Sequence, residues 1–334
     1  MNGRERGKLL RDAVFAEYEK RAEDRRPNRI RPSELGHECS RYLWYRFRWA
    51  DTFETFEGRM HRLFGTGHSQ EDRLLADLRM VGAEVFARDP ENAKEQIGCE
   101  LLNGHMKGFL DGVARNVPYS NADYVVAECK SHSDKSFAGL QRDGVAIAKP
   151  THYAQMQLYM REHSLFEALY LAVNKNNDDL YFEFIEHDKR YSDNLVKKAG
   201  AIVSTSTSPP RINNNGTFFK CKMCSAHDVC HKGIPPSRSC RTCRFAEPKL
   251  HDGEAQGWNC MLHEMPLTLD KQRAGCEHHR FLPDMLAGKP YGEVQKEDVW
   301  DYIYADQDGE LFYDTGPTGD KSLSQQEAAL LSKA

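Results

Sequence analysis

The chain has 334 residues, of which 29% are charged and 40% hydrophobic, and its formal net charge is −4. No apolar run approaches the roughly 20 residues that cross a bilayer, and the start of the chain has no apolar segment like that of a signal peptide. We therefore expect a cytoplasmic protein with no membrane contact. The charge is uneven: residues 291–334 hold ten acidic and three basic residues, whereas residues 21–48 hold eight basic and four acidic ones.

The first third of the chain predicts a helical arm followed by a mixed basic and aromatic segment. Residues 4–22 carry both charges and favour a helix, and two prolines, Pro27 and Pro32, separate residues 1–32 from the rest of the chain. The segment after them interleaves basic and aromatic side chains, a pattern that suits a nucleic-acid backbone with stacked bases. In a helix, most of these aromatic residues would instead be core. The candidates for DNA contact are Arg41, Arg46 and Arg48.

A second helix is predicted after Gly65-Thr66-Gly67-His68, with leucines at 74, 75 and 78 on its apolar side. His68 and Glu71 fall on one face of an early turn. His68 at this position is a candidate metal ligand or phosphate contact.

Three strands come next. Residues 100–102 and 105–113 read as two strands, joined at Asn103-Gly104, which is a typical hairpin turn. Residues 124–129 read as a buried strand, on which Glu128 and Lys130 share one face because strand side chains alternate. An acid and a base in such a place are costly unless they are paired or bound to something.

Asp111, near the end of the second strand, is placed to face the end of the Glu128 strand. Two carboxylates and a backbone carbonyl, that of Cys129, are the hard oxygen donors that Mg²⁺ or Mn²⁺ prefers. A divalent ion there would activate water and offset charge on a phosphate, and Lys130 would orient that water or neutralise developing charge. These residues predict phosphodiester hydrolysis.

The following elements complete an α/β core. Residues 152–163 predict a helix on which Gln155 and Tyr159 share a face. Two apolar strands over 168–173 and 180–185 and a helix over 188–204 follow. This order predicts a central mixed sheet flanked by helices.

Together these motifs resemble the RecB-like branch of the PD-(D/E)XK nuclease superfamily. The likeness rests on His68 in GTGH, Asp111 in GFLDG, the E-x-K element Glu128-Cys129-Lys130, and the QxxxY pair Gln155 and Tyr159. It implies a nuclease core over residues 33–232 in which His68, Asp111, Glu128 and Cys129 hold the metal. It also implies that Lys130 assists the water, while Gln155 and Tyr159 help to hold DNA and Lys130.

A first cysteine set surrounds this core: Cys221, Cys224 and Cys230 follow it and Cys39 precedes it. In a reducing compartment such cysteines are expected to bind metal, and their spacing suits a four-iron cluster or zinc, to which His227 or His231 could contribute. The AddB-type helicase-nucleases and the CRISPR-associated RecB-like exonucleases have the same layout. That resemblance implies a 4Fe-4S cluster that joins the two ends of the core, with Zn²⁺ as the alternative.

A second cysteine set predicts a structural zinc module over residues 233–285. Its ligands would be Cys240, Cys243, Cys260 and Cys276, with His263, His278 and His279 as competitors. Residues 286–334 form an acidic tail, in which we expect a hairpin over 300–313 and a helix over 324–332. The tail could mimic DNA, dock a partner or be a solvated appendage.

The leading hypothesis is a Mg²⁺- or Mn²⁺-dependent DNA exonuclease that acts on single strands or duplex ends. Its setting would be recombination, repair or phage replication in a bacterial or phage-infected cytoplasm, with a possible recombination or replication protein as partner. One alternative is a non-catalytic iron–sulfur and zinc protein that binds nucleic acid. Another is an endonuclease of restriction or CRISPR-adaptation type.

Overall fold

A computed structural model describes residues 1–334 except 23–25, 54, 91, 251–256, 297–298, 307, 316–320 and 324–334. The helix expected over residues 324–332 therefore lies outside the described residues. Among the described residues, no helix has the length and apolar character needed to span a membrane.

The centre of the molecule is a five-stranded mixed sheet. Its strands, in the order β1-β4-β5-β6-β7, are Glu84–Phe86, Gly112–Arg115, Tyr124–His132, Glu167–Asn174 and Leu180–Glu186. Only β5 and β6 run parallel among the neighbouring pairs of this sheet, as their connection through two helices requires. The expected α/β fold with a central mixed sheet is confirmed.

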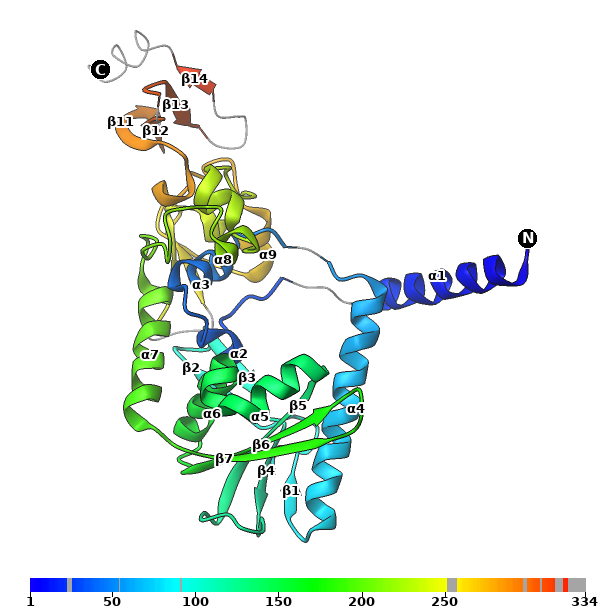
Figure 1. Cartoon of the computed structure of the whole chain (residues 1–334). Coiled ribbons are helices and arrows are strands. Elements are labelled where there is room, and N and C mark those ends of the chain that lie inside the picture. Colours follow the sequence, from blue (N-terminus) through cyan, green and yellow to red (C-terminus); the bar gives the residue numbers. More distant parts are fainter. Residues whose placement is uncertain are drawn as a thin grey trace.

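Helices cover both faces of this sheet (Figure 1). Helix α4 (Gly58–Met80) packs leucines on one face, while α5 (Asp134–Ala148) and α6 (Pro150–Glu162) cover the other, with α7 (Lys189–Ser204) beside α6. Alternation along β5 sends Val126 into the core beneath α5 and α6, and Ala127 and Cys129 into the core beneath α4. Glu128, two residues after Val126, is thereby turned toward α6.

The strand expected over residues 105–113 is two strands that belong to different sheets. Strand β3 (Met106–Phe109) pairs with β2 (Gly98–Leu101) in a separate ribbon, and β4 begins at Gly112 in the central sheet. The turn between β2 and β3 has four residues, not two, and Leu102 and Asn103 adopt positive φ values of 55° and 50°. Asp111 therefore lies at the junction of the two sheets. Helix α5 was not predicted from the sequence.

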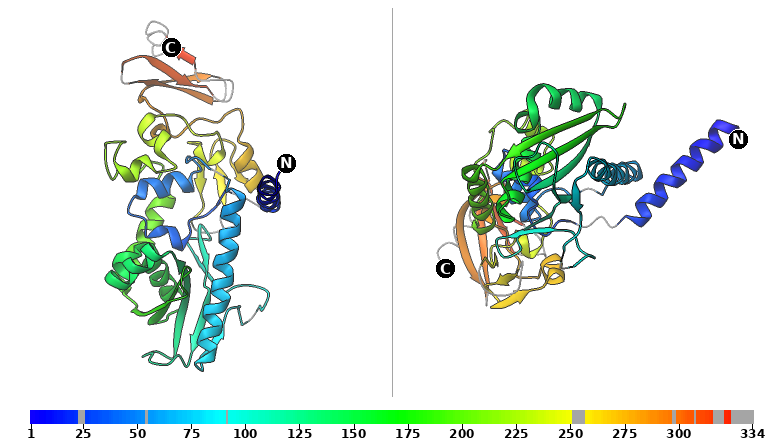
Figure 2. Two further views of the ribbon diagram at one scale, coloured as in Figure 1. Left: turned by 45° about the vertical axis from the view of Figure 1, so that its right-hand side comes forward. Right: turned by 90° about the horizontal axis from the view of Figure 1, so that it is seen from below.

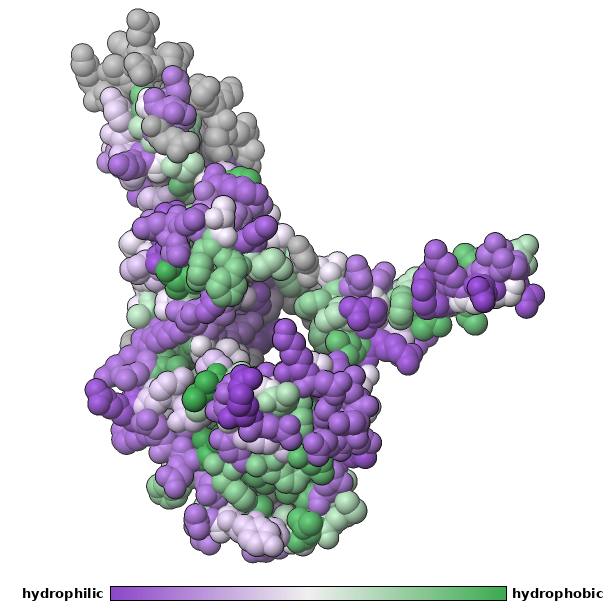
Figure 3. Space-filling model, viewed as in Figure 1, coloured by the Kyte–Doolittle hydropathy of each residue, from purple (hydrophilic) through white to green (hydrophobic). Residues whose placement is uncertain are grey.

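The N-terminal arm is a helix, as predicted. Helix α1 (Gly3–Arg21) begins at a capping box formed by Asn2 and Glu5, buries no residue and contacts α4. Figure 2 shows it extending away from the rest of the chain, and its visible surface is mostly hydrophilic (Figure 3). Two short helices, α2 (Pro32–Leu35) and α3 (Ser40–Phe47), lead into the core.

The cysteine-rich segment shares one hydrophobic core with α3. Trp44 and Phe47 of α3 belong to the same cluster of buried residues as Trp258 and Phe281. The expected boundary at residue 233 thus crosses a continuous core. The elements of this region are α8 (Phe219–Lys222), η1 (Asp228–Lys232), η2 (Cys240–Thr242), β8 (Ala246–Pro248), β9 (Trp258–Cys260), β10 (Met265–Leu267), α9 (Leu269–Ala274) and η3 (Pro283–Met285).

The hairpin expected in the acidic tail is present. Strands β12 (Val299–Ala305) and β13 (Leu311–Asp314) pair antiparallel, within a four-stranded sheet completed by β11 (Lys289–Lys296) and β14 (Lys321–Leu323). Arg280 holds this sheet to the cysteine-rich segment, because its Nη2 donates to Asp301 Oδ1 at 2.6 Å.

Candidate active site

Asp111 lies where the two sheets meet, and its carboxylate is fixed by the neighbouring strand. The backbone N–H of Cys129 on β5 donates to Asp111 Oδ2 at 2.8 Å. The pairing of β4 with β5, in which Gly112 faces Ala127, brings this contact about. The expected approach of Asp111 to the Glu128 strand is thus seen in the structure.

Lys130 places its ammonium group among three oxygens. Its Nζ donates to Glu128 Oε1, lies 3.7 Å from Asp111 Oδ2 and donates to the Cys129 carbonyl at 3.2 Å. Glu128 is completely buried, and its other oxygen, Oε2, has no hydrogen-bond partner among the described residues. Because buried carboxylate oxygens are rarely left without a partner, this site is built for a cation or a further donor.

Burial and charge both act on the acidity of this cluster. Burial, opposed by Lys130 and reinforced by the Asp111 carboxylate, raises the pKa of Glu128 to about 7. Burial disfavours the charged form of Lys130, but Glu128 and Asp111 outweigh it and leave the pKa of Lys130 above its usual value. One cation between two carboxylates leaves a local excess of negative charge.

The pair Gln155 and Tyr159 on α6 fixes the strand that leads to Asp111. Gln155 Nε2 donates to the Tyr159 hydroxyl at 3.2 Å, and that hydroxyl donates to the Phe109 carbonyl at 2.8 Å. A side chain at Gly108 would begin 2.8 Å from the same hydroxyl, so glycine allows this close approach. Gln155 Oε1 is buried without a hydrogen-bond partner among the described residues. The two residues therefore position the site through β3.

His68 and Glu71 of α4 border the same groove as Asp111. His68 is exposed and Glu71 partly buried. Burial raises the pKa of Glu71, and the nearby Asp111 carboxylate raises it further, whereas His68 lowers it. Glu71 was not among the predicted metal ligands, although its spacing of three residues from His68 was the available signal.

A groove of about 840 Å³ opens beside these residues. Asp111, Gln155 and Tyr159 border it, and Figure 3 shows the surface hollowed beside α4. Its basic side chains, which the sequence analysis did not single out, are Arg29, Arg31, Arg88 and Lys107. Arg29 and Arg31 lie in the basic stretch over residues 21–48, which is the sequence feature that could have indicated them.

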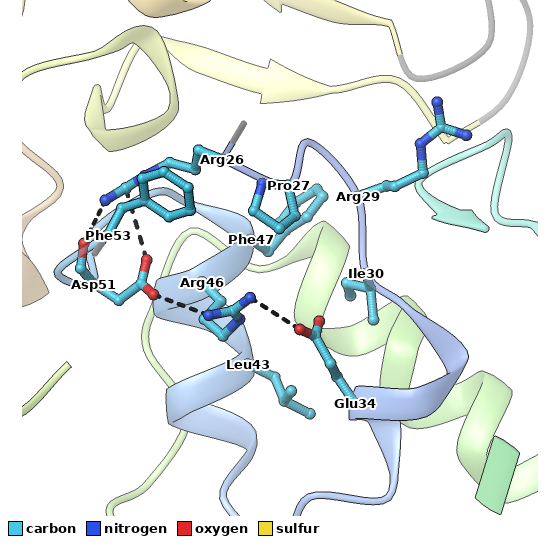
Figure 4. A pocket seen from close by; sticks show the side chains of 10 residues that line it. All are labelled: Arg26, Pro27, Arg29, Ile30, Glu34, Leu43, Arg46, Phe47, Asp51 and Phe53. Carbon is cyan, nitrogen blue, oxygen red and sulfur yellow. Dashed lines mark hydrogen bonds and ion pairs between the residues drawn. The ribbon is translucent and has the colours of Figure 1, made fainter. Parts of the chain in front are cut away.

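The arginines expected to contact DNA are instead engaged within the protein. Arg48 is 1% exposed and donates to the carbonyls of Thr205 and Ala246, so the expectation for Arg48 was wrong. Arg46 forms ion pairs with Glu34 and Asp51 at 2.9 and 3.3 Å (Figure 4). Arg41 donates to the Tyr45 hydroxyl and the Pro209 carbonyl. For Arg41 and Arg46, DNA contact stays a prediction.

A polar network lies behind Glu128. In the pairing of β5 with β6, Tyr170 is opposite Glu128, and its hydroxyl lies 2.9 Å from His132 Nε2 and 2.8 Å from His152 Nδ1. Burial lowers the pKa of His132 to about 4 and that of His152 to about 3. Both rings are therefore neutral at pH 7 and add no charge to the site.

The first cysteine set converges on one pocket of about 110 Å³, bordered by Cys39, Cys221, Cys224 and Cys230. His227 and His231 border it too, and their rings stack with centroids 5.3 Å apart. Among the described residues, no three of these donors have ligand atoms within 4.8 Å of one another. The same is true, among the described residues, of Cys240, Cys243, Cys260 and Cys276, so this criterion does not distinguish a zinc site from the site of a larger group.

Two of the histidines expected to compete as ligands lie close to the second cysteine set. Burial and then Cys243 raise the pKa of Cys240 to about 12, with Cys276 and Cys260 adding to the shift, so the four thiols are neighbours. Cys276 Sγ lies 4.0 Å from His263 Nε2, and His263, Cys276 and His278 bring three ligand atoms within 4.8 Å of one another. The remaining competitor, His279, is buried and its ring nitrogens bond to Thr242 and Arg238.

No family model and no curated protein matches the chain. A solved structure called SSO0001 aligns with 66% of this chain and 96% of its own, at 15% identity and a TM-score of 0.39. An alkaline exonuclease from Laribacter hongkongensis aligns with 57% of this chain and 89% of its own, at 14% identity and a TM-score of 0.35. The same exonuclease in complex with dAMP gives a TM-score of 0.33. Likeness at this level decides neither fold nor function.

Proposed function

We propose that the chain is a metal-dependent DNA exonuclease that hydrolyses phosphodiester bonds. The observation that carries this proposal is the cluster of Asp111, Glu128 and Lys130 beside a groove with basic side chains. Acidic oxygens suit a cation, and basic side chains suit a phosphate backbone. The same groove therefore provides for both parts of the reaction.

The chemistry of the donor set suits Mg²⁺ or Mn²⁺, because Asp111, Glu128 and the Cys129 carbonyl are hard oxygen donors. Among the described residues, no three of the side-chain donors Asp111, Glu128, His68 and Glu71 have ligand atoms within 4.8 Å of one another, and Glu128 Oε2 has no hydrogen-bond partner. His68 or Glu71 would complete the set from α4. An ion held there would polarise the phosphate and acidify the attacking water.

The side chains of the chain itself supply position and charge. The Lys130 ammonium, kept protonated by its carboxylate neighbours, would offset the negative charge that develops on the phosphate. Tyr159 and Gln155 hold the strand before Asp111 in place and so preserve the geometry of the cluster. The basic side chains of the groove would bind the phosphates on either side of the cut.

For the first cysteine set we propose a 4Fe-4S cluster held by Cys39, Cys221, Cys224 and Cys230. The four cysteines border one pocket of about 110 Å³, and thiolates grouped in this way hold a four-iron cluster or zinc. The layout of one cysteine before the core and three after it favours the cluster. Zinc is the alternative that metal analysis would detect.

For the second set we propose one structural zinc ion with ligands from Cys240, Cys243, Cys260 and Cys276. The proximity of His263 and His278 to Cys276 makes these histidines the alternative ligands. Soft sulfur and imidazole nitrogen donors suit zinc in either combination. Neither the geometry nor the resemblance gives this module a role beyond a structural one, and the pathway and the partner rest on the resemblance alone.

Cleavage of end-labelled oligonucleotides tests the proposal. We expect single strands or duplex ends to be shortened with Mg²⁺ or Mn²⁺, and Asp111→Asn and Lys130→Met to lower the rate by roughly 1000-fold. Asp143→Asn, which removes an exposed ion pair with Arg142 on α5, is the matched control and should cleave normally. A wild-type protein that binds DNA and never cuts it would favour the non-catalytic alternative, and cuts at internal sites alone would favour an endonuclease.

A further inference from the structure

One face of β3 is left open beside the candidate active site. Met106 is completely buried and Gly108 faces Pro32 and Tyr159, whereas Lys107 and Phe109 share the opposite face. Phe109 is 46% exposed although it is large and apolar, and it lies two residues before Asp111. Both Phe109 and Asp111 border the groove.

The neighbouring strand leaves the Phe109 ring uncovered. In the pairing of β2 with β3, the residue opposite Phe109 is Gly98, which has no side chain. A Cβ atom added at Gly98 would meet no described atom within 4 Å, so nothing packs closely on the ribbon at this point. The Phe109 backbone is nonetheless held firmly, because its carbonyl accepts a hydrogen bond from Tyr159.

One cation lies beside this exposed ring, and others border the same groove. Lys107 Nζ lies 5.6 Å from the centroid of the Phe109 ring and pairs with Glu100 at 2.8 Å. Arg29, Arg31 and Arg88 border the same groove. A fixed aromatic ring among phosphate-binding cations is the arrangement by which proteins bind single-stranded nucleic acid, where unpaired bases stack on the ring.

We propose that Phe109 is a stacking platform for a base next to the scissile phosphate, and that it selects an unpaired strand. This inference rests on the proposed nuclease function, and it adds that the groove accepts an unpaired strand. Inside a duplex both faces of each base are already covered by its neighbours, so away from the terminal pair the ring has a partner only where bases are unstacked. Because Phe109 and Asp111 are two residues apart, the stacked nucleotide adjoins the bond that is cut.

Abasic sites scanned along a single-stranded oligonucleotide test this contact. With the wild-type protein, one abasic position should slow cleavage of the adjoining bond by roughly tenfold, as the loss of one stacked base predicts. Phe109→Ala should slow cleavage of the intact strand by a similar factor. For this variant, an abasic site should cause no further loss of cleavage rate. Phe182→Ala is the matched control, because Phe182 is 45% exposed on β7 and is not among the residues bordering the groove.

A second variant tests the open space without altering Phe109. Gly98→Leu would cover the ring from the neighbouring strand, and it should reproduce the loss on single strands. Gly139→Leu on α5, where an added side chain also meets nothing within 4 Å, should cleave normally. Circular dichroism of both variants establishes that they are folded.

The outcomes separate the two proposals. An abasic penalty that persists undiminished in Phe109→Ala would overturn the stacking platform while the nuclease function stands. The same holds if Phe109→Ala loses activity on duplex ends and single strands to the same extent. If the wild-type protein cleaves no DNA with Mg²⁺ or Mn²⁺, both proposals fall together.

Discussion

Two regions of this molecule bury charged side chains. They differ in how completely the surrounding protein compensates for the free-energy cost of that burial. In the core built on the central sheet, Glu128 is completely buried yet keeps one oxygen without a hydrogen-bond partner among the described residues. In the cysteine-rich region, Arg241 is 1% exposed and donates to Gln272 and to the Phe47 carbonyl. The aromatic rings of Trp49 and Trp258 also lie 4.4 and 4.8 Å from its guanidinium carbon.

The difference distinguishes a binding site from a structural contact. A buried charge costs several kcal/mol unless its surroundings compensate for it. Around Arg241 the compensation comes from protein atoms, although burial still lowers the pKa of Arg241 to about 9. Around Glu128 it is incomplete, and the neighbouring Asp111 borders a groove. Incomplete compensation beside a groove is what a ligand-binding site requires.

The comparison predicts the largest effect at Glu128. Glu128→Gln should lower the rate of DNA cleavage by roughly 1000-fold, because it removes a charged ligand of the proposed metal ion. The free energy of unfolding should change by less than about 1 kcal/mol, because a buried charge is also removed. Single-turnover cleavage with Mn²⁺ and urea unfolding measure the two effects. A large loss of stability would make Glu128 a structural residue like Arg241.

The next effect is expected at the first cysteine set. Cys221→Ser should remove bound iron and lower the free energy of unfolding by on the order of 4 kcal/mol, because the proposed cluster would join α3 to the segment after α7. Iron and zinc analysis of anaerobically purified protein, with its visible absorption, provides the measurement. Cys99→Ala is the control, since Cys99 is buried outside both sets and its loss should leave the metal content unchanged. Two zinc ions and no iron would contradict the cluster.

Replacement of Arg241 should affect stability and not cleavage, which is the reverse of the effect expected at Glu128. Arg241→Met should lower the free energy of unfolding by about 3 kcal/mol, because its partners lose their donor and its space is imperfectly filled. The folded fraction should retain the wild-type cleavage rate, since Arg241 does not border the groove. Urea unfolding followed by fluorescence, with activity measured at low urea, tests both parts. Normal stability combined with lost cleavage would reverse the comparison.

The smallest effect concerns pH and the completely buried His105. Burial lowers the pKa of His105 to about 4, although its Nε2 lies 3.0 Å from the Lys249 carbonyl. Above pH 6.5 the imidazole of His105 is neutral in both the folded and the unfolded chain. Between pH 6.5 and 4 this imidazole takes up a proton in the unfolded chain but not in the folded chain, so the free energy of unfolding falls as the pH is lowered. By pH 5 the loss from this group should be roughly 1 to 2 kcal/mol.

Replacement of His105 isolates that contribution. His105→Gln should be less stable than the wild type at pH 7.5, and its stability should fall less steeply between pH 6.5 and 5. Urea unfolding across this range gives the slopes. Parallel slopes for the two proteins would show that His105 does not cause the loss.

Local pattern was enough to predict much of the core. The run over residues 124–129 predicted strand β5. Because side chains alternate along a strand, it also predicted that Glu128 and Lys130 share one face. Spacing of four residues located Gln155 and Tyr159 on α6. Spacing did not show that β3 and β4 belong to different sheets, because pairing partners such as Gly98 for Phe109 lie outside the local window.

The sequence alone determined which residue types are available for metal and phosphate chemistry, since those are properties of individual side chains and of their local spacing. Only the tertiary structure decided which of them are exposed. It buried Arg48 against Trp258 and left Arg31 and Arg88 beside the groove. Burial depends on contacts between segments far apart in the chain, and the same arginine side chain can therefore be a structural contact in one place and a phosphate ligand in another.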